Sequence, residues 1–63
     1  SFKMKTKQDI EKQMKGIEWT INSYKRQDKY YAQDGDFEKV ADYSQKIVAL
    51  EAELTLLKWV LDL

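Results

Sequence analysis

The chain has 63 residues with 11 basic and 11 acidic side chains, and it contains no cysteine, no histidine and no proline. A chain this short forms one small domain with a marginal core, which association with further chains often completes. Without thiols there are no disulfides or thiolate metal sites, and without imidazoles the commonest metal ligand and acid–base group is missing. We therefore expect a cytoplasmic protein that is not an enzyme and uses no cofactor and no metal.

The ends of the chain show no sign of membrane insertion. Charged residues interrupt the most apolar segment before it reaches the roughly 18 residues of a membrane span. The basic N-terminus lacks the apolar run of a signal peptide. Residues 1–3 precede Met4 and are candidates for an expression-tag remnant, with residues 1–63 otherwise forming a single domain.

The first predicted helix extends from about residue 7 to residue 33. Thr6 is the expected N-cap, with Asp9 at the third helical position, where a capping box places an acidic or amide side chain. Side chains at alternating steps of three and four form a heptad seam that faces one neighbouring helix. Its members are Ile10, Met14, Ile17, Ile21, Tyr24, Asp28 and Tyr31. Asp28 is the only charged member, and we expect its carboxylate to reach water or a tyrosine hydroxyl.

A large aromatic residue lies on the opposite side of this helix. Trp19 is about 165° from the seam at 100° per residue, and cationic residues and a tyrosine share its side. We call this surface the Trp19 stripe; it comprises Lys12, Lys15, Trp19, Arg26 and Tyr30. An exposed aromatic beside an arginine is typical of an interface hot spot, so the stripe is the candidate partner-binding surface. Packing in an oligomer interface is the alternative interpretation.

The clearest break in the helical pattern is the segment from Gln33 to Asp36. Gly35 can adopt the left-handed conformation that ends a helix, and Asp36 can cap the next helix. The flanking aspartates do not have the spacing of a calcium-binding loop. The second helix is predicted from about residue 37 to residue 61, and so short a linker makes the two helices antiparallel neighbours.

The second helix is apolar on two sides, which indicates burial on two sides. One ridge, formed by Val40, Ile47, Leu54 and Leu61 with flanking residues, matches the seam of the first helix. A second ridge lies roughly 150° away. We call it the Trp59 stripe; it comprises Ala41, Val48, Ala52, Leu56, Trp59 and Leu63. We expect this stripe to be the oligomer interface, in a homodimeric four-helix bundle or a higher helical oligomer.

The fold class predicted is therefore an all-α, antiparallel two-helix hairpin. Residues 1–33 carry a net charge of +4 and residues 34–63 a net charge of −4, so the two halves attract each other. In architecture alone, a hairpin that pairs into a bundle is similar to the small plasmid protein that controls primer RNA. Small lysine-rich, cysteine-free hairpins also resemble accessory proteins of phages and plasmids.

Three functions are compatible with this pattern. The first is a non-enzymatic interaction module that binds itself and modulates a larger protein, as phage- or plasmid-type inhibitors and adaptors do. The second is binding of RNA, DNA or a nucleotide ligand through the basic, tyrosine-bearing first helix, where aromatics and cations alternate. The third is a purely structural assembly protein. No membrane partner is expected.

Overall fold

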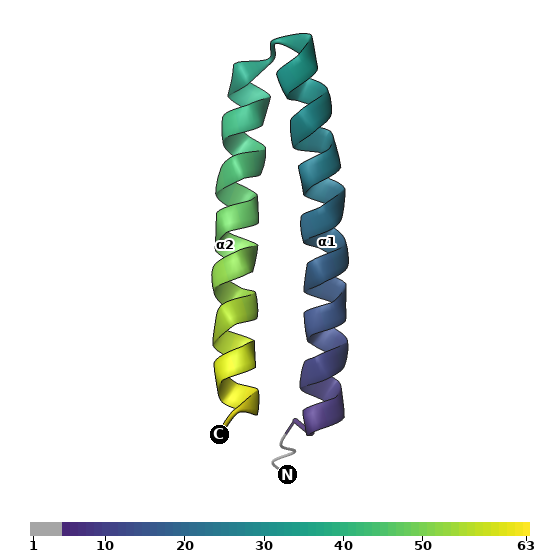
Figure 1. Ribbon diagram of the computed structural model, residues 1–63, viewed down its shortest axis with the longest axis vertical. Helices are drawn as coiled ribbons and strands as arrows, with labels where there is room; N and C mark the ends of the chain where they lie inside the picture. The colour runs from purple at the N-terminus through teal and green to yellow at the C-terminus, as the bar shows by residue number, and fades with distance from the viewer. Residues whose placement is uncertain (1–4) are drawn as a thin grey trace.

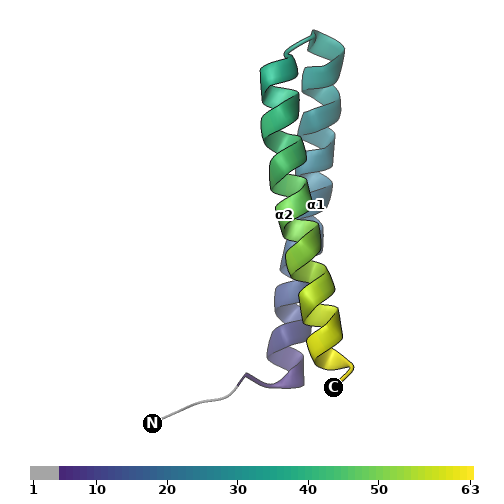
Figure 2. The same ribbon diagram turned by 90° about the vertical axis from the view of Figure 1, so that its left-hand side faces the viewer.

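The computed structural model describes residues 5–63 and consists of two antiparallel helices, α1 (Lys7–Asp34) and α2 (Phe37–Leu61). The helices lie side by side along their whole length and cross at a shallow angle (Figures 1 and 2). The all-α hairpin predicted from the sequence is confirmed, with α1 ending one residue beyond the expected boundary. The interpretation of residues 1–3 as a tag remnant concerns residues outside those described. In residues 5–63, neither helix has a segment long and apolar enough to cross a membrane.

Local hydrogen bonds fix where α1 begins. The Asp9 N–H donates to the Thr6 hydroxyl at 3.1 Å, and the Thr6 N–H donates to the Asp9 carboxylate at 3.0 Å. This reciprocal pair is a full capping box, although the third position holds aspartate in place of the usual glutamate or glutamine. The hydrogen bonds from the backbone and hydroxyl of Thr6 lower the pKa of Asp9 below its ordinary value of 3.8.

The turn between the helices depends on Gly35 and Asp36. Gly35 has φ = 78° and ψ = 11°, the left-handed conformation that residues with a Cβ rarely adopt. Its N–H donates to Ala32 O at 3.2 Å, and the Asp36 N–H donates to Tyr31 O at 3.0 Å. The Asp36 carboxylate then accepts a hydrogen bond from the Lys39 N–H at 3.2 Å and caps α2. The sequence prediction for this turn is confirmed.

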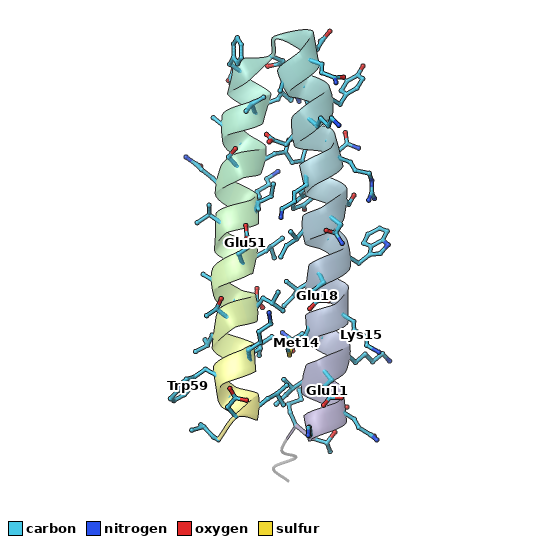
Figure 3. The ribbon with its side chains drawn as sticks, in the orientation of Figure 1. Glu11, Met14, Lys15, Glu18, Glu51 and Trp59 are labelled. Atoms are coloured by element: carbon cyan, nitrogen blue, oxygen red, sulfur yellow. The ribbon has the colours of Figure 1, made fainter. Side chains whose placement is uncertain are left out.

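The core is a single row of side chains between the two helices. Ile17, Ile21 and Ile47 are buried, and half-buried side chains of both helices pack against them. Every residue of the predicted seam of α1 is buried or half-buried, as is the matching ridge of α2. Met14 points between the helices in Figure 3. Only three residues of the described chain are buried, because a second helix covers just one side of each helix.

Candidate interaction surfaces

The predicted partner-binding residues lie on one exposed side of α1. All members of the Trp19 stripe are exposed, with Trp19 at 70% and Tyr30 at 62%. Figure 3 shows Lys15 pointing away from α2 on this outer side. The structure therefore gathers the predicted residues on one surface. At 1.5 Å per residue, this surface extends about 27 Å along the helix.

Gly16 lies beside Trp19 in the interior of α1. Among residues 5–63, a methyl group at Gly16 would meet no atom within 4 Å apart from its chain neighbours and the adjacent backbone of α1. Glycine inside a helix is about 1 kcal/mol less favourable than alanine. Packing within the hairpin therefore gives no reason for glycine here, whereas the close approach of another molecule would.

Tyrosines and lysines form a cluster next to the turn. The rings of Tyr24 and Tyr43 meet edge to face at 5.4 Å between centroids, and Tyr31 stacks on Tyr43 at 5.8 Å. The ammonium group of Lys46 lies 5.2 Å from the Tyr43 centroid and 5.9 Å from that of Tyr24. Such cation–π contacts add roughly 0.5–1 kcal/mol at exposed positions. Tyr24 belongs to the seam predicted from the sequence, whereas the position of Lys46 beside the rings was not predicted.

This cluster leaves little aromatic surface for a nucleic acid. Tyr24, Tyr31 and Tyr43 are half-buried, and the Lys39 ammonium group lies 5.5 Å from the Tyr31 centroid. Tyr30 is exposed, and its ring meets the edge of Tyr31 at 5.2 Å. Within this cluster, Tyr30 alone presents a largely exposed ring for a base to stack on.

Asp28 occupies a half-buried position in the seam. Its Oδ1 is shielded from solvent and makes no hydrogen bond within the part of the chain that the structure describes. The expected bond to a tyrosine hydroxyl is therefore not formed by this atom. A shielded acceptor without a partner typically costs about 1–3 kcal/mol.

Every member of the Trp59 stripe is exposed in the single chain. The exposed fractions are 67% for Val48, 59% for Leu56 and 60% for Trp59, and Leu63 reaches 86%. Ala41 and Ala52 are exposed as well. Trp59 points away from α1 in Figure 3, so the stripe lies on the side of α2 that α1 does not cover.

Two further features of α2 were not predicted. Phe37 is 73% exposed and extends the Trp59 stripe toward the turn; its four-residue spacing from Ala41 could have revealed this. A shallow, mainly apolar depression of about 350 Å³ lies beside Val48. It is lined by Ser44, Gln45, Val48 and Ala49. Sequence periodicity gave no signal for this hollow, because it arises from small side chains next to larger ones.

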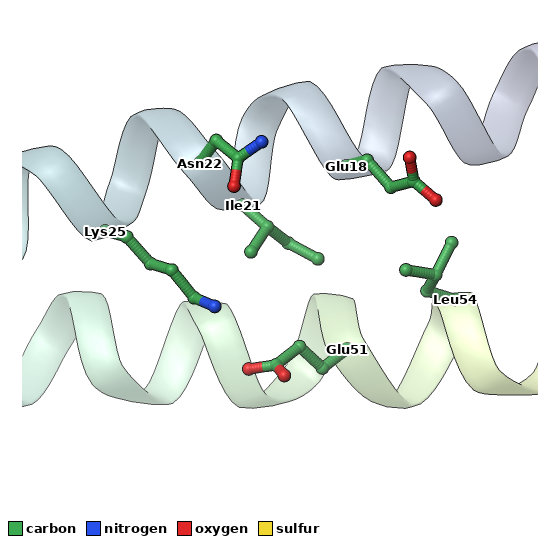
Figure 4. A pocket seen from close by; sticks show the side chains of 6 residues that line it. All are labelled: Glu18, Ile21, Asn22, Lys25, Glu51 and Leu54. Atoms are coloured by element: carbon green, nitrogen blue, oxygen red, sulfur yellow. The ribbon is translucent and has the colours of Figure 1, made fainter.

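A second hollow, between the helices, has mixed polarity. Its volume is about 310 Å³, and Ile21 and Leu54 contribute apolar surface to it (Figure 4). The charged residues around it carry both signs: the carboxylates of Glu18 and Glu51 and the ammonium group of Lys25. Within residues 5–63 there is no cluster of three or more acidic side chains placed to hold a metal ion. This hollow therefore has neither a uniform charge for attracting an ion nor a closed apolar wall.

Comparison of the chain with protein-family models, with characterised proteins and with solved structures gives no match.

Proposed function

We propose that the chain is a self-associating, non-enzymatic helical interaction module that binds a larger protein through the Trp19 stripe and modulates it. Small phage- or plasmid-type inhibitors and adaptors act in this way. The observation that carries the proposal is the 70% exposure of Trp19 on the side of α1 away from the core. Tryptophan, tyrosine and arginine are the residues most enriched at binding hot spots, and the Trp19 stripe contains all three.

The surroundings of Trp19 support docking against a folded surface. The space above Gly16 lets another backbone or ring approach α1 closely beside the indole. Lys12 and Lys15 are exposed on the same side, where their charges can steer an acidic partner and set its orientation. An aromatic anchor with cations around it fits a protein surface that offers an apolar pocket with an acidic rim.

Nucleic-acid binding through α1 receives less support. Three of the four tyrosines are half-buried in the cluster beside the turn. Within Lys7–Asp34 there are six basic and five acidic residues, so the helix itself carries a net charge of only +1. Single-strand binders combine a continuous positive groove with several free aromatic rings. The third possible function is a purely structural role, in which the Trp19 stripe contacts only further copies of the chain. The experiment below distinguishes it from the other two.

The test compares substitutions of the two exposed tryptophans, with Trp59→Ala as the matched control for Trp19→Ala. The tagged chain and its Trp19→Ala and Trp59→Ala variants serve as baits in extracts of the source cells, with and without nuclease. We expect a protein captured by the native bait to be lost with Trp19→Ala, while the helicity and particle mass of that variant stay unchanged. The captured protein is then purified, and its affinity for the native chain should fall much less steeply with salt than the affinity of a nucleic-acid binder does.

Two results would contradict the proposal. Loss of self-association in Trp19→Ala would assign Trp19 to an interface between copies of the chain. Capture that disappears after nuclease treatment, together with an affinity for single-stranded RNA that falls steeply with salt, would assign α1 to nucleic acid.

A further inference from the structure

The outer side of α2 carries an apolar surface with no charge in it. From Ala41 to Leu63 the Trp59 stripe and the residues between its members on that side include no acidic or basic side chain. Thr55 lies within this surface, and its hydroxyl donates to Glu51 O at 2.9 Å in its own helix. The threonine can therefore present its methyl group outward without leaving its hydroxyl unpaired. Such a surface is suited to burial against another apolar face.

The exposed area of the chain is larger than its mass requires. A compact monomer of 7.5 kDa is expected to expose about 4,200 Å², whereas this chain exposes 5458 Å². The excess is more than about 1,000 Å², and one partner in a standard interface buries about 800 Å². Burial of about 800 Å² in one further interface would therefore remove about two thirds of this excess.

Side-chain size changes along this surface. The half nearer the turn carries small side chains and the depression lined by Ser44, Gln45, Val48 and Ala49. The half nearer the C-terminus carries the large exposed side chains Leu56, Trp59 and Leu63. Parallel pairing of two copies would set indole against indole and leave gaps between the small residues. Antiparallel pairing sets the large side chains near the C-terminus of one copy against the smaller ones near the turn of the other, and large-against-small pairing is how packed cores are filled.

We infer that a second copy of this chain covers the Trp59 stripe, with the two α2 helices antiparallel and related by a twofold axis beside Ala52. In this register Val48 faces Leu56 of the second copy, and Ala41 faces its Leu63. Trp59 then lies opposite Gln45 and fills the depression beside Val48. Because the axis is twofold, each dimer contains this contact twice.

The arrangement has a direct consequence for the Trp19 stripe. Since the Trp59 stripe faces away from α1, the two α2 helices form the centre of the dimer and the α1 helices lie outside. Both Trp19 stripes stay exposed, so the dimer presents the proposed docking surface twice. The inference deepens the self-association in the proposed function, but it does not depend on what the Trp19 stripe binds.

The chain contains no cysteine, so single cysteines can report the register directly. A disulfide requires Cα atoms within about 7 Å of each other. We expect Ala52→Cys to form a disulfide-linked dimer under mild oxidation, because the two copies of position 52 meet at the axis. Ala41→Cys should not link to itself, because its two copies lie about 33 Å apart in this register. A mixture of Ala41→Cys and Leu63→Cys chains should form the mixed dimer, and Ala32→Cys on α1 controls for random collision.

The burial of Trp59 in the dimer interface is measured by fluorescence in a Trp19→Phe background, where the indole of Trp59 is the only one in the chain. Its fluorescence should shift to longer wavelength as the protein is diluted through the dimer dissociation range. In the Trp19-containing chain, Trp59→Ala should weaken dimerisation by at least about 30-fold, as expected for an aromatic anchor that fills a depression on the partner. Trp19→Ala, the matched control on the other helix, should leave the dissociation constant unchanged.

Three outcomes would overturn the inference. Efficient linking of Ala41→Cys to itself would show parallel pairing. A chain that is monomeric by sedimentation at high micromolar concentration would leave the stripe uncovered by a second copy. A particle mass above that of a dimer would replace the twofold pair with a larger assembly. None of these results alters the capture experiment on Trp19, so failure of the register and failure of the docking proposal can be told apart.

Discussion

Replacing Gly16 by alanine separates folding from binding at the Trp19 stripe. The new methyl group would meet no side chain of the described residues within 4 Å, its two chain neighbours aside, so no steric penalty offsets the gain in helix propensity. That gain is about 0.5–1 kcal/mol for glycine to alanine inside a helix. For a domain of this size, 1 kcal/mol corresponds to about 4–8 °C in melting temperature. We therefore expect Gly16→Ala to melt several degrees above the native chain.

The chain's other glycine supplies the matched control. Gly35 has φ = 78°, and a residue with a Cβ in this conformation costs about 1–2 kcal/mol. Gly35→Ala should therefore lower the melting temperature, although the same atoms are added. Both variants are compared with the native chain by circular dichroism at one fixed concentration, since self-association makes the melting temperature depend on concentration.

The binding measurement uses the same Gly16→Ala protein. If a partner approaches α1 closely at this position, the methyl group obstructs it, and capture should weaken while the hairpin becomes more stable. A melting temperature at or below that of the native chain would contradict the open space described around Gly16. Higher stability with full capture would mean that the partner does not approach this residue.

Three further substitutions test the hairpin itself. Asp28→Leu should raise the free energy of unfolding by about 1–3 kcal/mol in chemical denaturation, because it removes a shielded oxygen without a partner. A lower free energy of unfolding would show that the carboxylate has a hydrogen-bond partner. Ile21→Ala should lower the free energy of unfolding by about 2–4 kcal/mol, since Ile21 is 6% exposed at the centre of the core. An effect below about 1 kcal/mol would place the core elsewhere. The depressed pKa of Asp9 means that its ionised form stabilises the folded state above pH 3.8, and that this contribution is lost as pH falls through the lowered pKa. Asp9→Asn should remove that part of the acid dependence in melts between neutral and acidic pH, and an unchanged pH profile would refute the coupling.

Periodicity in the sequence was sufficient to predict the backbone of this protein. Steps of three and four residues identified the seam. Gly35 and Asp36 identified the turn, because glycine readily adopts the left-handed conformation that ends a helix and aspartate is a favoured N-cap. The exposed positions of Trp19 and Trp59 also followed from the angle of each residue around its helix. A repeat pattern assigns a residue to a side of a helix, and it needs no knowledge of the neighbouring side chains.

Features that depend on the relative height of the two helices could not be predicted in this way. Lys46 lies near two tyrosine rings, and Gln13 donates to Glu53 across the helices at 3.4 Å. Both contacts require a particular rotamer on each helix. The isolated oxygen of Asp28 and the depression beside Val48 likewise result from the shapes of several neighbours. Sequence patterns therefore predicted which sides of the helices are exposed, and the structure was needed for the side-chain contacts and the depression on those sides.

The most direct test of the account is the molar mass of the native chain by sedimentation equilibrium over a dilution series. We predict a mass twice the 7.5 kDa of one chain at high concentration, falling toward one chain on dilution as the Trp59 stripe becomes exposed. A folded, cooperatively melting particle with the mass of a single chain at every concentration would contradict it.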